Sequence, residues 1–282
     1  MSDVPAEKVP QLQGRGGTMP ALGFGTWRLN GSECVEAVSR ALQMGYRHID
    51  SAQAYQNEEE VGIGIRDSGV ERREIFLTTK IPPDRLDEAS LRIAVHESLD
   101  RLGTDYVDLL LMHWPNPQVP LEETLAAMAA AVEDGEVRHI GLSNFTVQLM
   151  KEAEMKSERP IFCNQVEYHP LLSEAPVLDY CREKGILLTA YCPLARGKVL
   201  REPVVEQIAR KHARTPAQMV LRWLLQQDGV ATIPKSASAE RQRENFEIFD
   251  FEIPEAEMRA ISALERGERV ARAGGHAPEW DT

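Results

Sequence analysis

The chain has 282 residues, of which 43% are hydrophobic and 27% charged, a composition typical of globular proteins that bury a sizeable core. Its 32 basic and 44 acidic residues leave a net charge of −12, and no block of basic residues occurs. This balance argues against nucleic acid or an anionic membrane as the main partner. An anionic small molecule would have to be bound by a local basic cluster.

Short apolar runs alternate with amphipathic segments from residue 22 onward, and this alternation predicts eight strand-helix units. The runs expected to be strands span residues 22–27, 45–50, 74–80, 106–114, 137–144, 161–168, 186–194 and 229–236. The expected helices span residues 32–45, 57–69, 86–103, 120–135, 145–156, 173–185, 204–213 and 239–249. The strands are apolar on both faces, as in a parallel sheet that helices cover.

Two α/β folds show such alternation, the closed (β/α)8 barrel and the open doubly wound sheet. An open sheet that binds a dinucleotide carries a G-x-G-x-x-G turn after its first strand. The segments GFGTWR, residues 23–28, and GIGIRD, residues 62–67, each have two glycines and lack the third. Eight units without a break in composition therefore favour a single (β/α)8 TIM barrel.

The two ends of the chain lie outside the repeating units. A glycine-rich turn between two short extended pieces predicts a hairpin in the N-terminal segment, residues 1–20, across the N-terminal mouth of the barrel. A last helix is expected over residues 254–265, followed by a C-terminal loop over residues 265–282. We expect one domain that spans residues 1–282.

Cysteine and histidine usage gives no sign of a metal site or a disulfide framework. The four cysteines lack C-x-x-C spacing, and the seven histidines are scattered. Residues 1–20 lack the apolar core of a signal peptide, and no run approaches 18 apolar residues. Since no heptad or apolar stripe indicates a partner subunit either, we expect a cytoplasmic monomer that acts on a small molecule.

Polar residues gather where the predicted strands end, which is where such barrels carry their active sites. These residues are Asp50 and Tyr55, Lys80, His113 and Trp114, Ser143 and Asn144, Gln165, Tyr191, and Lys235 and Ser236. Each one alone has an ordinary explanation, such as a turn-forming Asp or a packed Tyr. Their joint occurrence predicts a site at the C-terminal mouth of the barrel.

Seven segments, in order, resemble the aldo-keto reductase family: HIDSAQAYQNEEEVG, LTTKI, VDLLLMHWP, GLSNF, NQVEYHP, AYCPLARG and IPKSASAERQRENFEIFDF. The resemblance runs from about Met19 to the last helix. LARGK and the terminal APEW are similar to the short-tailed bacterial branch of 2,5-diketo-D-gluconate reductase B. The resemblance implies NADPH-dependent reduction of small aldehydes and ketones, with 2,5-diketo-D-gluconate and methylglyoxal-like dicarbonyls as candidate substrates.

The resemblance further implies a catalytic tetrad of Asp50, Tyr55, Lys80 and His113. A Tyr hydroxyl is a poor acid at neutral pH, and a nearby ammonium group favours the phenolate and lowers the pKa. Lys80 would act in this way on Tyr55, and Asp50 would hold Lys80 in place. His113 would orient the carbonyl oxygen toward the Tyr55 hydroxyl.

For the cofactor, the family pattern places Ser143, Asn144 and Gln165 at the nicotinamide carboxamide and Tyr191 under the nicotinamide ring. Lys235, Ser236 and Arg241 offer positive charge and hydrogen-bond donors that suit a 2′-phosphate. This favours NADPH over NADH as the cofactor. The remaining implied cofactor positions are Leu194, Glu244 and Asn245, the last two at the adenosine end. There are two alternative explanations. Asn144 and Gln165 could be buried side chains that only satisfy hydrogen bonds at the barrel rim, and the segment ERQREN could be a solvated helix start.

The substrate pocket is expected to have tryptophan walls. The candidates are Trp27, Trp114 and Trp280, with core packing as the alternative for the first two. Three tail arginines could meet an anionic substrate, or could be solvated surface charge: Arg266, Arg269 and Arg272. Two positions depart from the family pattern, because Cys192 stands where many relatives have Ser and Gln53 is bulkier than expected in long-tailed members.

Two other functions compete with this interpretation. Tyr180 and Lys184 have the Y-x-x-x-K spacing of short-chain dehydrogenases, but a helix simply places them on one face, and the glycine-rich nucleotide turn is missing. A non-catalytic NADPH-binding sensor or structural protein on the same fold is the other alternative, since fold alone does not decide function. An intact tetrad favours turnover.

Overall fold

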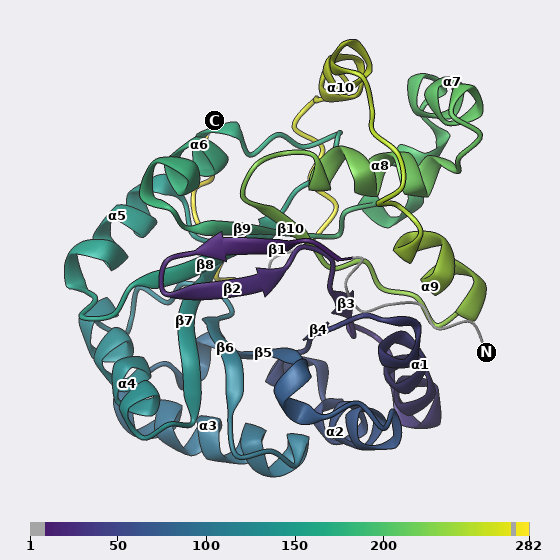
Figure 1. Cartoon of the computed structure of the whole chain (residues 1–282). Helices are drawn as coiled ribbons and strands as arrows, with labels where there is room; N and C mark the ends of the chain where they lie inside the picture. Colours follow the sequence, from purple (N-terminus) through teal and green to yellow (C-terminus); the bar gives the residue numbers. More distant parts are fainter. Residues whose placement is uncertain (1–8, 272–274, 282) are drawn as a thin grey trace.

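The computed structural model describes residues 9–271 and 275–281. Eight parallel strands form one sheet in the order β10-β9-β8-β7-β6-β5-β4-β3, so that strands consecutive in the chain are neighbours in space (Figure 1). They are β3 (Phe24–Gly25), β4 (His48–Asp50), β5 (Phe76–Ile81), β6 (Val107–Met112), β7 (Val137–Ser143), β8 (Ile161–Glu167), β9 (Leu187–Tyr191) and β10 (Val230–Thr232). All eight predicted strands are confirmed, each shorter than the apolar run that predicted it.

Backbone hydrogen bonds between the first and last strands close the sheet into a barrel. The N–H of Gly23 donates to Thr232 O at 2.8 Å, and the N–H of Thr232 donates to Ala21 O at 2.8 Å. Leu22 and Thr232 form a parallel bridge. A Cβ at Gly25 would lie 2.7 Å from Ile233 O, so the glycines of GFGTWR serve this close approach of strands.

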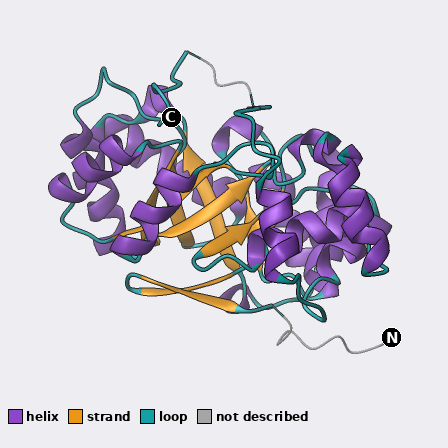
Figure 2. Ribbon diagram, turned by 90° about the horizontal axis from the view of Figure 1, so that it is seen from above, coloured by secondary structure: helices purple, strands orange, loops and turns teal. Residues whose placement is uncertain are grey.

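Helices surround the strands (Figure 2). They are α1 (Gly31–Met44), α2 (Glu58–Asp67), α3 (Glu88–Leu102), α4 (Leu121–Glu133), α5 (Val147–Lys156), α6 (Ala175–Lys184), α7 (Pro203–Lys211), α8 (Pro216–Leu225), α9 (Ala239–Phe246) and α10 (Glu255–Ser262). The glycines of GIGIRD lie in α2, where a Cβ at Gly62 would lie 2.3 Å from Leu102 O. They therefore let α2 approach its neighbours closely. Within the described residues, no helix is both long and apolar enough to cross a membrane.

Helix α8 is absent from the sequence-based prediction and corrects it. It packs against β10, whereas α7, expected to be the seventh barrel helix, packs on α8 and α10 away from the strands (Figure 1). Thr215 caps α8 by accepting the N–H of Gln218, whose side chain accepts the N–H of Thr215 in return. The sequence of α8 does carry a helical pattern, since polar Gln218 and Arg222 lie four residues apart in an otherwise apolar segment, but the sequence-based prediction assigned this stretch to no element.

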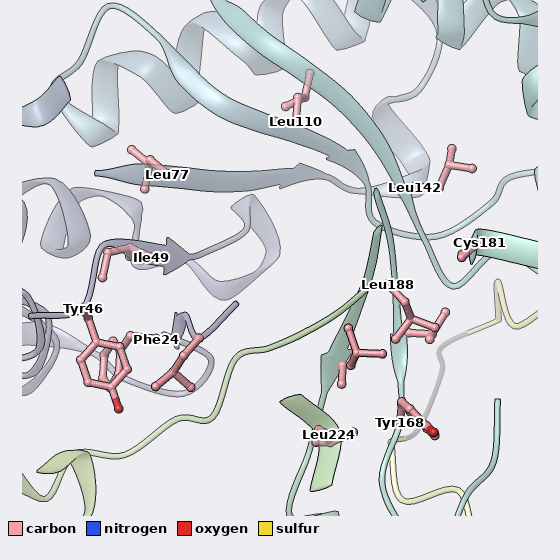
Figure 3. Packing of buried hydrophobic residues seen from close by; sticks show 14 of the residues in the cluster. Phe24, Tyr46, Ile49, Leu77, Leu110, Leu142, Tyr168, Cys181, Leu188 and Leu224 are labelled. Carbon is pink, nitrogen blue, oxygen red and sulfur yellow. The ribbon is translucent and has the colours of Figure 1, made fainter. Parts of the chain in front are cut away.

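The predicted N-terminal hairpin is present as β1 (Gln11–Gly14) and β2 (Gly17–Pro20), and it lies across the N-terminal end of the barrel (Figures 1 and 2). Met19 is fully buried against barrel-interior residues that include Phe76, Phe162 and Leu187. The larger apolar cluster lies between strands and helices, with Ile49, Leu77 and Leu188 among its members (Figure 3). Burial on both faces of the strands thus explains their unbroken apolar pattern.

Candidate active site

Four polar side chains meet at the C-terminal mouth of the barrel, where the sequence places a tetrad. Asp50 ends β4, and Tyr55 ends the short 3-10 turn Gln53–Tyr55 that follows. Lys80 lies near the end of β5, and His113 directly follows β6. Neighbouring parallel strands end at the same edge, so residues 63 positions apart in the chain become neighbours in space.

The Lys80 ammonium group is the centre of this arrangement and is fully buried. Its Nζ lies 2.5 Å from Asp50 Oδ1, 2.7 Å from Ser51 O and 3.4 Å from Tyr55 Oη. Gln165 Nε2 donates to the other carboxylate oxygen of Asp50 at 2.7 Å. A buried charge pair needs such additional hydrogen bonds to offset its desolvation.

The pKa of Tyr55 departs from the sequence-based expectation. Burial, followed by the negative charge of Asp50, raises the pKa of Tyr55 well above its ordinary value. Burial lowers the pKa of Lys80, and the Asp50 charge acts in the opposite direction. The expected lowering of the Tyr55 pKa by Lys80 does not prevail in this arrangement, because burial of the hydroxyl dominates and the charge of Asp50 acts in the same direction. Tyr55 holds its proton at neutral pH and is equipped to donate it.

His113 is a neutral imidazole. Burial, and then the positive charge of Lys80, lower the pKa of His113 to about 3. Its ring meets that of Tyr55 edge to face, with ring centroids 5.7 Å apart. A neutral imidazole carries one N–H donor, which suits a hydrogen bond to a carbonyl oxygen. Both side chains line the same cavity.

The side chains expected at the nicotinamide form one hydrogen-bonded group beside the tetrad. Asn144 Nδ2 donates to His113 O at 2.9 Å and to Ser143 Oγ at 3.1 Å, and Tyr191 Oη donates to Asn144 Oδ1 at 2.7 Å. Ser143 Oγ in turn donates to Gln165 O at 2.9 Å. Asn144 has φ 65°, a left-handed conformation that Asn tolerates better than most residues. Its side chain is thus rigidly held at the cavity.

The segment expected to bind the 2′-phosphate turns into helix α9. Lys235 is exposed and lines the cavity, and Arg241 is exposed in the first turn of α9. Ser236 is buried, and its Oγ accepts the N–H of Ser238 at 3.1 Å. Two expected cofactor residues lie deeper in the fold. Glu244 accepts a hydrogen bond from Thr215 Oγ1, which ties α9 to α8, and Asn245 is buried.

A cavity of about 300 Å³ opens at the barrel mouth between these groups. Its walls are Gly25, Thr26, Trp27, Asp50, Ala54, Tyr55, His113, Trp114, Ser143, Asn144, Gln165, Tyr191, Cys192, Pro193, Arg196, Ile233, Lys235 and Ala271. Trp27 is 37% exposed, so core packing does not account for it. Trp280 lies outside these walls and packs edge to face on Trp114, with ring centroids 6.2 Å apart. Leu194 packs against the apolar core beside the cavity.

The structure adds two basic side chains that sequence reasoning missed. Arg28 and Arg196 lie 4.4 and 5.3 Å from the ring centre of Trp27, and Arg196 also lines the cavity. Cys192, Ala195 and Arg196 all have positive φ, at 49°, 47° and 53°. Gly197, also at positive φ, signals a turn here, but the three preceding positions at positive φ carry side chains that give no such signal, so the direction of Arg196 was not predictable.

The tail arginines bind the protein's own carboxylates. Arg266 pairs with Glu202 and Glu268, each at 2.8 Å. Arg269 pairs with Glu174 at 2.8 Å. Their suggested contact with an anionic substrate therefore finds no support in the structure, and Arg272 lies outside the described residues.

Gln53, which departs from the family pattern, points away from the cavity. Its Nε2 donates to Ala94 O at 2.7 Å and to Ser98 Oγ at 2.9 Å, both on helix α3. Gln53 is absent from the walls of the cavity, whereas Tyr55, two residues later, is one of them. The amide of Gln53 thus fixes the short turn that presents Tyr55.

We expect Gln53→Leu to lower kcat about tenfold while the Kd for NADPH stays unchanged. Loss of both hydrogen bonds frees the turn, and small displacements of a reacting group are costly. Steady-state kinetics and cofactor fluorescence titration would measure the two quantities. Ser98→Ala should cause a smaller loss, and the double variant should fall short of the sum of the two losses. Additive losses would contradict a shared role.

Clusters of three or more His, Cys, Asp or Glu side chains that could hold a metal ion do not occur in residues 9–271 and 275–281. The site instead consists of a buried Lys-Asp pair, a Tyr hydroxyl, a neutral imidazole and a group of amides around one cavity at the mouth of a (β/α)8 barrel. These features are typical of a barrel oxidoreductase that uses an organic cofactor.

Sequence comparison gives the family. The profile of the Aldo/keto reductase family matches residues 21–266, and the chain belongs to that family. It is 45% identical to the glyoxal reductase of Bacillus subtilis over 257 residues, which is 89% of this chain and 91% of the relative. It is 41% identical to the methylglyoxal reductase DkgB of Escherichia coli O157:H7 over 266 residues, which is 93% of this chain and 99% of the relative.

Solved structures agree with the family assignment. A candidate 2,5-diketo-D-gluconic acid reductase B is 45% identical and superimposes with a TM-score of 0.95, covering 97% of this chain and 98% of that one. An aldo-keto reductase of Bombyx mori in complex with NADP is 33% identical with a TM-score of 0.88, covering 94% and 95%. The chain is therefore an NADP-dependent oxidoreductase of the aldo-keto reductase family, and no observation supports the non-catalytic alternative.

Proposed function

We propose that the protein reduces small dicarbonyl compounds, with Tyr55 as the proton donor. Glyoxal, methylglyoxal and diketo-sugar acids are the candidate substrates. The observation that carries the proposal is the Tyr55 hydroxyl, which lines the cavity, keeps its proton and lies 3.4 Å from the buried Lys80 ammonium. The names of the two relatives support the substrate class.

In this proposal NADPH, when bound, supplies the hydride that reduces the carbonyl carbon. The alkoxide that would result is a stronger base than a phenolate, so it takes the proton of Tyr55 even though the pKa of Tyr55 is raised. Lys80 then stabilises the phenolate across the 3.4 Å contact. His113 donates a hydrogen bond to the carbonyl oxygen and so holds it toward Tyr55.

The chain's own groups fit the cofactor. Amide and hydroxyl groups of Asn144, Gln165 and Ser143 face the cavity and can bind a carboxamide, and Tyr191 offers its ring for stacking. Lys235 lines the cavity and Arg241 lies six residues later in the first turn of α9, and both are exposed cations that would offer donors to a 2′-phosphate. Leu194, Ser236, Glu244 and Asn245 complete the proposed cofactor site.

Lys235→Met and Arg241→Met should each raise the KM for NADPH about tenfold or more and leave the KM for NADH unchanged. A charge-assisted hydrogen bond contributes about 1.5–3 kcal/mol, and NADH lacks the 2′-phosphate that would accept it. Arg243→Met, which removes an exposed cation from the same helix, serves as the control. An equal rise in the KM for NADPH and for NADH would show that neither residue binds the 2′-phosphate.

The cavity favours small substrates. Its volume of about 300 Å³ is at the low end for small-molecule sites, and aromatic rings of Trp27 and Trp114 form part of its walls. Arg196 and Lys235 give it positive charge on one side, which suits an acidic substrate or the cofactor phosphates. Trp280 is proposed to influence specificity through its contact with Trp114.

The experiment that tests the function follows the absorbance of the reduced nicotinamide. Purified protein is mixed with NADPH or NADH and with methylglyoxal, 2,5-diketo-D-gluconate or a neutral aromatic aldehyde. We expect rapid oxidation of NADPH, slow oxidation of NADH, and the highest kcat/KM for a dicarbonyl. A preference for the aromatic aldehyde would contradict the proposed substrate class.

Localisation and assembly are part of the same proposal. We infer a cytoplasmic monomer that forms one domain. All four cysteines are free thiols in the structure, as expected in a reducing compartment. The barrel closes on itself and carries its site within one chain.

A further inference from the structure

Glu167, the last residue of β8, has a fully buried carboxylate that binds the C-terminal part of the chain. Its Oε1 accepts the N–H of Val270 at 2.6 Å, and its Oε2 accepts the N–H of Ala271 at 2.9 Å. His169 Nε2 lies 3.0 Å from Oε1. One side chain of the barrel thus holds two successive backbone groups from residues more than 100 positions later.

The position of Glu167 on β8 links it to the active site. Side chains alternate along a strand, so Gln165 and Glu167 point to the same side. Gln165 donates to Asp50 and lines the cavity, and Glu167 lies one step closer to the mouth. Ala271, which Glu167 binds, is itself part of the cavity wall. The carboxylate therefore joins a wall of the cavity to the strand that carries Gln165.

Residues 265–271, here called the tail segment, contact the region after β8, and also the region after β9 through the ion pairs Arg266–Glu202 and Lys198–Glu268. The N–H groups of Arg266 and Glu268 donate to Leu171 O at 3.3 and 2.9 Å. The Arg269 guanidinium pairs with Glu174 and lies 3.7 Å from the ring centre of Trp280. Glu167 is the only fully buried carboxylate among these contacts to the described part of the tail segment.

Burial alone would favour the protonated, neutral form of Glu167, but its hydrogen bonds favour the ionised carboxylate. Burial raises the pKa of Glu167, and hydrogen bonds from His169, Val270 and Ala271 outweigh it, so the pKa ends below its ordinary value. Glu167 is therefore ionised at neutral pH. Backbone N–H groups bound to an ionised carboxylate form stronger bonds than those bound to a neutral acceptor. Release of the tail segment would leave this charge short of donors.

We propose that Glu167 is a positioning residue that fixes Ala271 in the cavity wall by binding the backbone N–H groups of residues 270 and 271. In this proposal Glu167 touches neither substrate nor cofactor. The expected change in KM rests on the proposed function, whereas the expected change in hydrogen exchange does not. Without the carboxylate, the tail segment leaves the mouth more often, and the carbonyl substrate loses one side of its site. The nicotinamide site, formed by other residues, remains.

The test compares Glu167→Gln with wild type and with the control Glu265→Gln. The substitution at Glu167 keeps the size of the side chain but turns an amide N–H₂ toward a backbone N–H, so at least one hydrogen bond is lost. Glu265 is an exposed carboxylate in the same segment. For Glu167→Gln we expect the KM for methylglyoxal to rise about tenfold, with kcat and the Kd for NADPH within about twofold of wild type. The control should match wild type.

Hydrogen exchange measured by mass spectrometry gives a readout that does not depend on turnover. Amides of the tail segment, residues 265–271, should exchange about tenfold faster in Glu167→Gln, and amides of β7 should exchange as in wild type. If Glu167→Gln does not fold, Glu167→Asp replaces it, since it keeps the charge and shortens the reach. Unchanged tail exchange overturns the proposal, and so does a fall in kcat without a rise in KM. If the wild-type protein reduces no carbonyl, the proposed function is refuted. The hydrogen-exchange data would still test whether Glu167 holds the tail segment.

Discussion

Tyr55→Phe should lower kcat about 10²–10⁴-fold and leave the Kd for NADPH within about twofold of wild type. The change removes the proton donor, and general acid catalysis contributes about that much to rate. The ring remains, so its edge-to-face contact with His113 and the shape of the cavity wall are preserved. Stopped-flow measurement of NADPH oxidation and a fluorescence titration of cofactor binding would give the two values.

Tyr168→Phe is the matched control for that variant. The Tyr168 hydroxyl donates to Gln227 at 2.6 Å, away from the cavity walls. Its loss should cost about 1 kcal/mol of stability and leave kcat unchanged. Tyr55→Phe that turns over at the wild-type rate would contradict the proposed proton transfer. A loss of NADPH binding equal to the loss of rate would assign Tyr55 to cofactor binding instead.

Lys80→Met should abolish turnover and lower the free energy of unfolding by about 3–5 kcal/mol. The variant leaves the Asp50 carboxylate buried without its cation, and breaking a buried ion pair from one side has this cost. Asp50 is 1% exposed and Lys80 is fully buried, so water cannot replace the lost partner. Urea denaturation followed by circular dichroism would measure the loss of stability.

The double variant Asp50→Asn/Lys80→Met separates stability from catalysis. It removes both charges, so most of the lost free energy of unfolding should return, whereas activity should remain absent. Such a result would show that the pair is kept for its chemistry. A double variant as unstable as Lys80→Met would mean that the contacts of Lys80 with Ser51 O and Tyr55, and not its charge, support the fold.

Much of the site could be predicted because a parallel barrel makes position in space follow from position in sequence. Once the strands are located, their C-terminal ends must meet, so Asp50, Lys80 and His113 had to become neighbours. From the sequence, the glycines at 23, 25, 62 and 64 could be excluded as a phosphate-binding loop, but their actual role could not be assigned. Their use in close strand and helix contacts required the structure.

Other features depend on partners far away in the chain, and no local pattern announces them. Helix α8 packs on β10 in the place expected for α7, and only the tertiary contacts show which of the two helices covers the strand. Gln53 could be seen as unusual, but its partners on α3 decide that it supports Tyr55 and does not narrow the pocket. The raised pKa of Tyr55 depends on burial and on the negative charge of Asp50.

Sequence alone was enough to predict eight strands, the (β/α)8 class of fold and most of the side chains at the barrel mouth, because hydrophobic period and strand-end chemistry are local properties. Tertiary structure alone decided which of those side chains bind one another, which face the cavity and which protons they hold. It also decided that Glu167 and the tail segment meet. Desolvation and hydrogen-bond geometry set these outcomes, and both arise only when residues distant in sequence are packed together.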